Sequence, residues 1–141
     1  MAFGVEFDAT WQIASDGVAT VNLAPLDGGV TYYTELVKVK VELGEGRVVG
    51  VEAAAFLAGR GSHTSYTATR SVAEARAVLT HLPEATYTRL ALIPKGTKHV
   101  LCREFTCERN GYTFIAYVGA NDLCEHDLFR VIDTDQGEML A

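Results

Sequence analysis

The sequence has few cysteines and prolines, no long apolar run and a shortage of basic side chains. Its cysteines are Cys102, Cys107 and Cys124. This small, odd number excludes the framework of disulfide-rich secreted domains, while one disulfide with a spare thiol and three free thiols both stay open. No apolar stretch is long enough to cross a bilayer. Twelve basic against eighteen acidic side chains give a net charge of -6, which argues against a module for duplex nucleic acid or anionic membranes.

The rest of the composition is that of a globular protein. Hydrophobic residues make up 48% and charged residues 21% of the 141 positions, so disorder is excluded. A chain of this length forms one ordinary domain or two very small units. It can bury roughly two-thirds of its unfolded surface, so no metal ion or disulfide is needed to hold it together.

The first half has the pattern of paired strands. Apolar and polar residues alternate over 5–13, Asp16-Gly17 supplies a tight hairpin turn, and 18–23 returns as a second strand. A second hairpin is predicted from 34–43 and 47–57, joined by a glycine-rich turn. Residues 59–70 lack periodicity and are rich in Gly, Ser and Thr, so we interpret them as the link between two units, 1–62 and 63–141.

The second half begins with the one clear helix. Ser71 and Glu74 have the spacing of a capping box, apolar residues follow at helical spacing, and Pro83 ends the pattern, which predicts a helix over 71–82. Strands are predicted at 86–93, 99–108, 112–118 and 128–133, with a hairpin turn at Asn110-Gly111. We therefore expect an α+β fold of antiparallel sheets, with this helix packed on the second sheet.

Motifs for chemistry are missing from the sequence. Cys102 and Cys107 are five residues apart on a predicted strand and so point to opposite faces. Cys124 and His126 could face the same way in an extended chain, but no second pair has zinc-site spacing. Residues 133–138 begin like a calcium-binding loop, but their glycine is not at the position that such a loop requires. The sequence contains no nucleophile elbow and no phosphate-binding loop. A pair of carboxylates that meet in a cleft, as glycoside hydrolysis requires, stays open as an alternative. We predict no catalytic residue, no cofactor and no metal site.

Tyrosines offer the remaining functional signal. Exposed tyrosine rings favour protein or saccharide partners, although buried rings with wet hydroxyls are an equal alternative. Tyr32 and Tyr33 form an adjacent pair, while Arg60 and His63 lie in the irregular linker. We take these four residues as the candidate partner contacts.

Several segments together resemble one known family. They are 32–43 with 46–53, the helix start at 71–76, Arg89-Leu90-Ala91-Leu92-Ile93-Pro94, and the stretch 131–137. In order and spacing they are similar to the carboxy-terminal PepSY-repeat region of the YpeB family of spore germination proteins, from about residue 6 onward. The resemblance implies tandem PepSY-like units, the first lacking its helix. Without that helix a face of the first sheet is exposed, so a homodimer is a further possibility.

The resemblance also implies a role. It indicates a non-enzymatic module that stabilises, localises or restrains the cortex-lytic hydrolase SleB. It places the parent protein at the outer face of the inner spore membrane and the cortex, anchored by an amino-terminal segment outside this sequence, so that the present chain itself contacts no membrane. The alternative from another class is a module that binds the peptidoglycan of the spore cortex directly.

Overall fold

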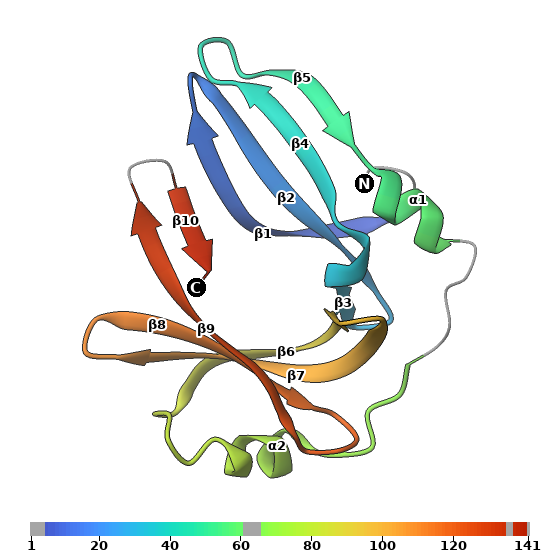
Figure 1. Ribbon diagram of the computed structural model, residues 1–141, viewed down its shortest axis with the longest axis vertical. Coiled ribbons are helices and arrows are strands. Elements are labelled where there is room, and N and C mark those ends of the chain that lie inside the picture. Colours follow the sequence, from blue (N-terminus) through green and yellow to red (C-terminus); the bar gives the residue numbers. More distant parts are fainter. Residues whose placement is uncertain (1–4, 61–65, 135–136, 141) are drawn as a thin grey trace. The chain divides into compact units, whose positions relative to one another are not determined.

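The structure is a computed structural model that describes residues 5–60, 66–134 and 137–140 (Figure 1). The chain divides into two compact units. Unit 1 comprises Met1–Thr64 and Ile132–Met139, and unit 2 comprises Ser65–Val131 and Leu140–Ala141. The predicted division at 62–63 differs from this one in that residues 132–139 group with the first unit.

Unit 1 is built on an antiparallel sheet. Its elements are β1 (Glu6–Ser15), β2 (Val18–Asp27), β3 (Val30–Tyr32), the 3-10 turn η1 (Tyr33–Glu35), β4 (Val37–Glu42), β5 (Arg47–Glu52), α1 (Ala54–Arg60) and β10 (Gly137–Leu140). β2 is central, because β1 pairs along one of its edges and β3 and β4 pair along the other. β5 continues the sheet beyond β4, and β10 pairs with β1 (Figure 1).

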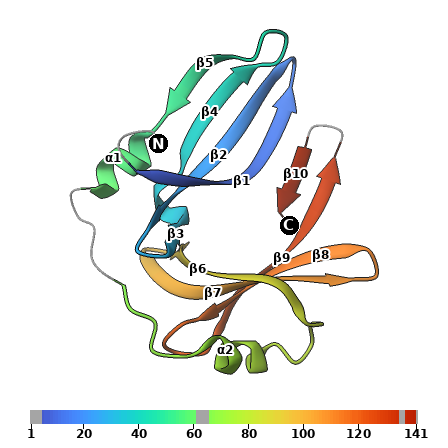
Figure 2. The same cartoon turned by 180° about the vertical axis from the view of Figure 1, so that it is seen from behind.

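Unit 2 is a helix on an antiparallel meander. It contains α2 (Val72–Val78), β6 (Ala85–Lys95), β7 (Lys98–Arg109), β8 (Tyr112–Gly119) and β9 (Glu125–Thr134), each strand pairing with the next. Figure 2 shows α2 lying against one face of these strands. The core between helix and sheet consists of Ala75, Leu79, Leu82, Phe105, Cys107, Ala116 and Val118. The predicted α+β fold with its helix on the second sheet is confirmed.

The predicted hairpin turns at Asp16-Gly17 and Asn110-Gly111 are present with the backbone that their residues favour. Asp16 and Gly17 have φ of 53° and 76°, and Asn110 and Gly111 have φ of 51° and 79°. Two successive positive φ angles match the right-handed twist of the flanking strands, and Asp, Asn and Gly tolerate them best. Local turn chemistry therefore fixes where β1 turns into β2 and β7 into β8.

The predicted strand over 47–57 is wrong in its second half. β5 ends at Glu52 and the helix α1 follows, so unit 1 has a helix where none was expected. The Glu52 carboxylate accepts the N–H of Ala54 at 3.2 Å and so satisfies one of the free donors at the helix start. Phe56, only 1% exposed, packs against the ring of Phe7 with centroids 5.4 Å apart. This burial explains why the apolar run after Glu52 is helical.

Helix α2 is shorter than predicted. It ends at Val78, and a turn over Leu79–Leu82 replaces the last predicted residues. The guanidinium of Arg76 donates to the carbonyl oxygens of Leu79 at 2.8 Å and Leu82 at 3.0 Å, and a third contact reaches Pro83. These bonds satisfy carbonyl groups that a continued helix would have used.

Two further differences concern strands. β2 continues through Pro25, which lies opposite Phe7 on β1, and β10 is a strand that the sequence did not predict. Within the described part of the chain, no helix is long and apolar enough to span a membrane.

Candidate protein-binding surfaces

Five of the valines on one face of the unit 1 sheet are half-buried or exposed, and we call them the valine face: Val21, Val39, Val41, Val48 and Val51. Register places them there, because Val39 pairs with both Val21 on β2 and Val51 on β5, and Val41 pairs with Val48. Directly opposite residues project from the same face of a sheet. Val48 and Val51 are 56% and 55% exposed, and the other three are half-buried.

A β-bulge lets β5 contribute to this face. The register shifts between Lys40 and Val41, so Val49 is an extra residue on β5 without an opposite partner on β4. Because of this extra residue, Val48 and Val51 point the same way although they are three positions apart. Val49 is itself 50% exposed, and Leu43 and Leu57 nearby in the sequence are 53% and 61% exposed.

The opposite face of the same hairpin carries the charges. Lys38, Lys40 and Glu42 alternate with the valines on β4, and Glu52 and Arg47 lie opposite Lys38 and Glu42 on β5. We call these five residues the charged face. The hairpin is therefore apolar on one side and charged on the other, and both sides reach solvent at β5.

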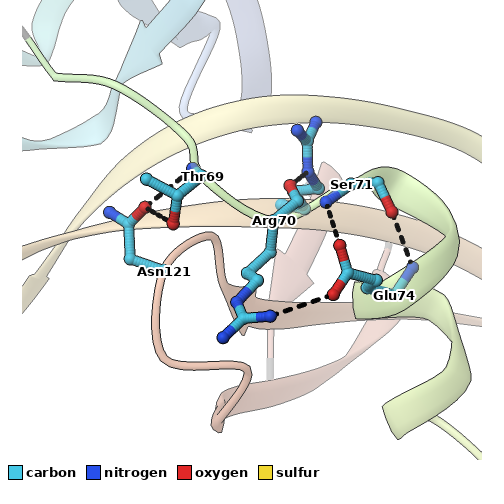
Figure 3. Close-up of polar contacts among 6 residues, drawn as sticks. Thr69, Arg70, Ser71, Glu74 and Asn121 are labelled. Atoms are coloured by element: carbon cyan, nitrogen blue, oxygen red, sulfur yellow. Dashed lines mark hydrogen bonds and ion pairs between the residues drawn. The ribbon is translucent and has the colours of Figure 1, made fainter.

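Polar side chains clamp the start of α2 in unit 2 (Figure 3). The predicted capping box is present, since Ser71 Oγ accepts from the N–H of Glu74 and the Glu74 carboxylate accepts from the N–H of Ser71, both at 3.1 Å. Arg70 donates to Glu74 at 3.2 Å. Ahead of the helix, the side chain of Asn121 accepts from the backbone N–H and the hydroxyl of Thr69 at 2.8 and 2.7 Å.

The clamp also joins this segment to the sheet. The N–H of Arg70 donates to the carbonyl oxygen of Ala120, and Nε of Arg103 donates to the carbonyl oxygen of Arg70, each at 2.9 Å. Beside it lies a shallow hollow of about 270 Å³, lined by Tyr66, His99, Val100, Leu101, Asn121 and Asp122. The clamp holds the chain entering α2 in one conformation and leaves Arg70 and Glu74 half exposed.

Asp122 organises the turn after β8. Its carboxylate accepts the N–H of Cys124 at 2.9 Å and contacts Nε2 of His126 at 3.0 Å. The bond from the Cys124 N–H, followed by the contact with His126, lowers the pKa of Asp122 below its ordinary value. A Cβ on Gly119 would meet the Asp122 carboxylate, so a glycine is needed at this position.

The carboxylate of Glu104 lies buried on the face of the unit 2 sheet that points away from α2. Glu104 is 2% exposed and accepts from Nε of Arg89 at 2.6 Å and from the hydroxyl of Tyr117 at 2.7 Å. All three residues sit opposite one another on β6, β7 and β8. A buried carboxylate must be paired in this way, because an isolated charge in the interior is very costly. We assign this cluster a structural role.

The cysteines divide into two buried thiols and one exposed thiol. Cys102 and Cys107 are buried and Cys124 is exposed, and all three are free. Burial, together with the nearby Asp122 and Asp127, raises the pKa of Cys102 to about 12, and burial raises that of Cys107. The two buried thiols therefore stay protonated at neutral pH and are poor nucleophiles.

The predicted contact residues have different environments. Tyr32 is 4% exposed at the end of β3, and Tyr33 is half-buried, stacked near Trp11 with centroids 6.3 Å apart. The side chain of Arg60 and the whole of His63 lie outside the described residues. The structure adds a pairing between His81 and Glu125 at 3.0 Å, which sequence proximity could not show.

The valine face was not predicted as a binding site, although the sequence contains the alternating valines that form it. Alternating valines over 37–41 predicted an apolar strand face, but not whether a helix would cover it. No group of three or more His, Cys, Asp or Glu side chains in the described ranges could hold a metal ion. The best-defined candidate site in the described ranges is an exposed apolar surface, the valine face.

Comparisons with known proteins agree with this picture. Residues 5–64 match the family model described as "YpeB sporulation, PepSY1 and PepSY2 domains". The sporulation protein YpeB of Bacillus subtilis (strain 168) is 32% identical over 128 residues, which are 90% of this chain and 28% of that protein. The YpeB protein of Halalkalibacterium halodurans is 30% identical over 108 residues, 76% of this chain and 24% of that protein.

A solved structure shares the fold. The Bacillus megaterium YpeB C-terminal domain superposes with a TM-score of 0.81 at 23% identity, covering 92% of this chain and 57% of that one. The chain is thus an α+β protein with the architecture of that domain. In the region that these relatives share, the chain matches the YpeB sporulation family, as the sequence predicted. It spans 28% and 24% of the length of the two curated relatives.

Proposed function

We propose that this chain is a non-catalytic protein-binding module of a sporulation and germination protein, and that it stabilises, localises or restrains the cortex-lytic hydrolase SleB. The valine face is the observation that carries the proposal. Val48 and Val51 are each more than half exposed on a hairpin that also exposes Leu43 and Val49. Grouped apolar side chains at a surface are typical of protein interaction sites.

The layout of the hairpin suits a specific partner. Protein interfaces have an apolar centre, and the valine face offers one on one side of the sheet, while the charged face on the same two strands points to the other side. A partner that covers the valines removes them from water, which is the main favourable term in association. Arg47 and Glu52, exposed at the ends of β5, belong to the charged face and stay in solvent when a partner covers the valines.

The non-catalytic part of the proposal rests on the chemistry of the side chains. The two buried thiols are held protonated, and the buried Glu104 is already engaged by Arg89 and Tyr117. The polar clusters around α2 and in the turn after β8 satisfy backbone groups there. Each of these groups has a structural partner that accounts for its position.

Such a module acts through differential affinity. It can protect the hydrolase from proteolysis, or keep it silent, only by binding its folded or inactive state more tightly than the alternatives. We place this action at the outer face of the inner spore membrane and in the cortex, with the parent protein anchored by an amino-terminal segment. The same placement brings the module close to the hydrolase and to its substrate.

Binding of the purified chain to SleB from the same organism tests the proposal. Replacing Val48 and Val51 together by serine removes apolar surface without adding charge, and we expect the dissociation constant to rise about tenfold or more. Leu128→Ser is the matched control, because Leu128 is 41% exposed but lies in unit 2. Equal affinity of the double variant and the wild type would contradict the role of the valine face.

Direct binding to peptidoglycan is the second candidate, favoured by two exposed rings in unit 2. Tyr87 and Tyr112 are 55% and 53% exposed, and the guanidinium groups of Arg89 and Arg130 lie 5.8 and 5.3 Å from their ring centres. Co-sedimentation of the chain alone with purified cortex fragments, lost in a Tyr87→Ala and Tyr112→Ala variant, would favour this alternative. A hydrolase-binding module need not co-sediment without its partner.

A further inference from the structure

The outer edge of β5 is open. β5 stands at the end of the strand order, paired with β4 along its inner edge and with no further strand among the described residues. On an edge strand, alternate backbone N–H and C=O groups point away from the sheet and can pair with another strand. Every residue of β5 except Gly50 is exposed. The edge can therefore accept an extended strand.

The sequence of β5 specifies what kind of strand fits. Arg47 at one end is basic, Glu52 at the other end is acidic, and the four residues between them are uncharged. An antiparallel partner must then place an acid opposite Arg47, a base opposite Glu52, and small or β-branched apolar residues between. β5 itself, read in the opposite direction, has this pattern.

We propose that β5 pairs antiparallel with β5 of a second copy of this chain, with Arg47 opposite Glu52 and Val48 opposite Val51 of that copy. The contact is isologous, so each of the two pairs occurs twice around a two-fold axis. Arg47 and Glu52 thus form two complementary charge pairs at the rim, with two valine pairs between them.

The β-bulge at Val49 makes this register possible. In a regular strand, residues three or five apart point to opposite faces, so Val48 could not meet Val51 on the same side. Here Val48 and Val51 both lie on the valine face, and Arg47 and Glu52 both lie on the charged face. A two-fold axis perpendicular to the sheet keeps like faces together. Both kinds of pair therefore match in a single register.

Pairing through the edge leaves the faces of the sheet free. The valine faces of the two copies become one continuous apolar surface, because Val48 and Val51 of one copy lie beside Val51 and Val48 of the other. Dimer formation is independent of the hydrolase-binding proposal, since it uses the backbone edge and requires no other protein. Either proposal can fail while the other stands.

Sedimentation equilibrium of the whole chain in about 0.15 M salt tests the pairing by charge reversal. The wild type is expected to show a concentration-dependent monomer–dimer equilibrium. Arg47→Glu puts acid opposite acid at both ends, and Glu52→Arg puts base opposite base, so each variant alone should raise the dissociation constant about tenfold or more. The two variants mixed should form a heterodimer, because each then supplies the charge that the other lacks.

Mixing the two variants distinguishes a loss of β5 pairing from a loss of the folded structure. Glu52 also accepts the N–H of Ala54, so Glu52→Arg could disturb α1, but a misfolded variant would not regain association on mixing. Arg109→Glu, at the end of β7 in unit 2, is the control with the same charge change and should dimerise like the wild type. The proposal is overturned if the wild type is monomeric throughout, if the mixed variants stay monomeric, or if Arg109→Glu has the same effect as Arg47→Glu.

Discussion

The two units solve the same packing problem in different ways. Each has an antiparallel sheet with one apolar face, but unit 2 lays α2 across that face and buries Ala75, Leu79 and Phe105 to 1% exposure or less. Unit 1 covers part of its sheet with Phe56 from α1 and leaves Val48 and Val51 more than half exposed. Burial by a helix stabilises a sheet, whereas an uncovered apolar face costs free energy unless a partner binds. Stability and binding are thus expected to reside in different units.

The largest expected effect is the difference in reaction rate between the exposed thiol of Cys124 and the buried thiols of Cys102 and Cys107. All three cysteines lie in unit 2, and only Cys124 is exposed. A chromogenic disulfide reagent should therefore react quickly with one thiol per native chain, and at least about 100-fold more slowly with Cys102 and Cys107, because they are buried and held protonated. All three should react at once in denaturant. Fast reaction of three thiols in the native protein would mean that the core of unit 2 opens readily.

Truncation of the unit 2 core should be far more costly than truncation of the valine face. Phe105→Ala removes a ring that is 1% exposed beneath α2, and we expect a loss of about 3–5 kcal/mol in the free energy of unfolding. Val48→Ala, at a site 56% exposed, should cost about 0.5 kcal/mol or less. Urea unfolding measures both. Similar costs for the two variants would refute the contrast between a closed and an open sheet.

Loss of the buried carboxylate should be intermediate in effect. Glu104→Gln leaves Arg89 without its charged partner, and we expect a cost of about 2–4 kcal/mol. Tyr117→Phe removes only one hydrogen bond to the same carboxylate and should cost about 1 kcal/mol. The order of these two costs, measured in the same unfolding experiment, is the test. A larger cost for Tyr117→Phe would show that the ion pair is not the main interaction.

The capping box should give a small effect and a pH dependence. Ser71→Ala removes the side-chain cap of α2 and should cost about 1 kcal/mol. Hydrogen bonds from the backbone N–H of Ser71 and from Arg70 lower the pKa of Glu74 from its ordinary 4.5. The ionised form is therefore favoured by folding, so this contribution is present above pH 4.5 and is lost as the pH falls through the lower folded-state value.

Melting temperatures of the wild type and Glu74→Gln across this range check the sign. The wild type should be the more stable at neutral pH, and the difference should shrink in acid. A difference that grows in acid would contradict the depressed pKa.

Much of the fold could be predicted from the sequence because its signals are local. Asn110-Gly111 and Asp16-Gly17 fixed two hairpins, and the spacing of Ser71 and Glu74 fixed the start of α2. Helix α1 was missed because a short apolar run after Glu52 fits either a strand or a helix, and only burial of Phe56 against Phe7 decides between them. The early end of α2 depends on Arg76 reaching carbonyl groups six and seven residues away along the chain.

The candidate sites were harder to predict than the fold. An alternating pattern such as that of Val39 and Val41 gives the apolar face of a strand but not what lies over it. The exposure of β5, the bulge at Val49 and the 4% exposure of Tyr32 all depend on contacts between distant segments. Residue type alone favoured tyrosines as contacts, whereas the register between β4 and β5 brought the valines together.

The one tryptophan, Trp11, lies on β1 in unit 1 and stacks near Tyr33, while every thiol lies in unit 2. Selectively excited tryptophan fluorescence and thiol labelling therefore report on separate halves of the same molecule without any engineered dye. During denaturation, a gap between the two signals would reveal one half melting while the other persists, and coincident signals would reveal a single cooperative transition.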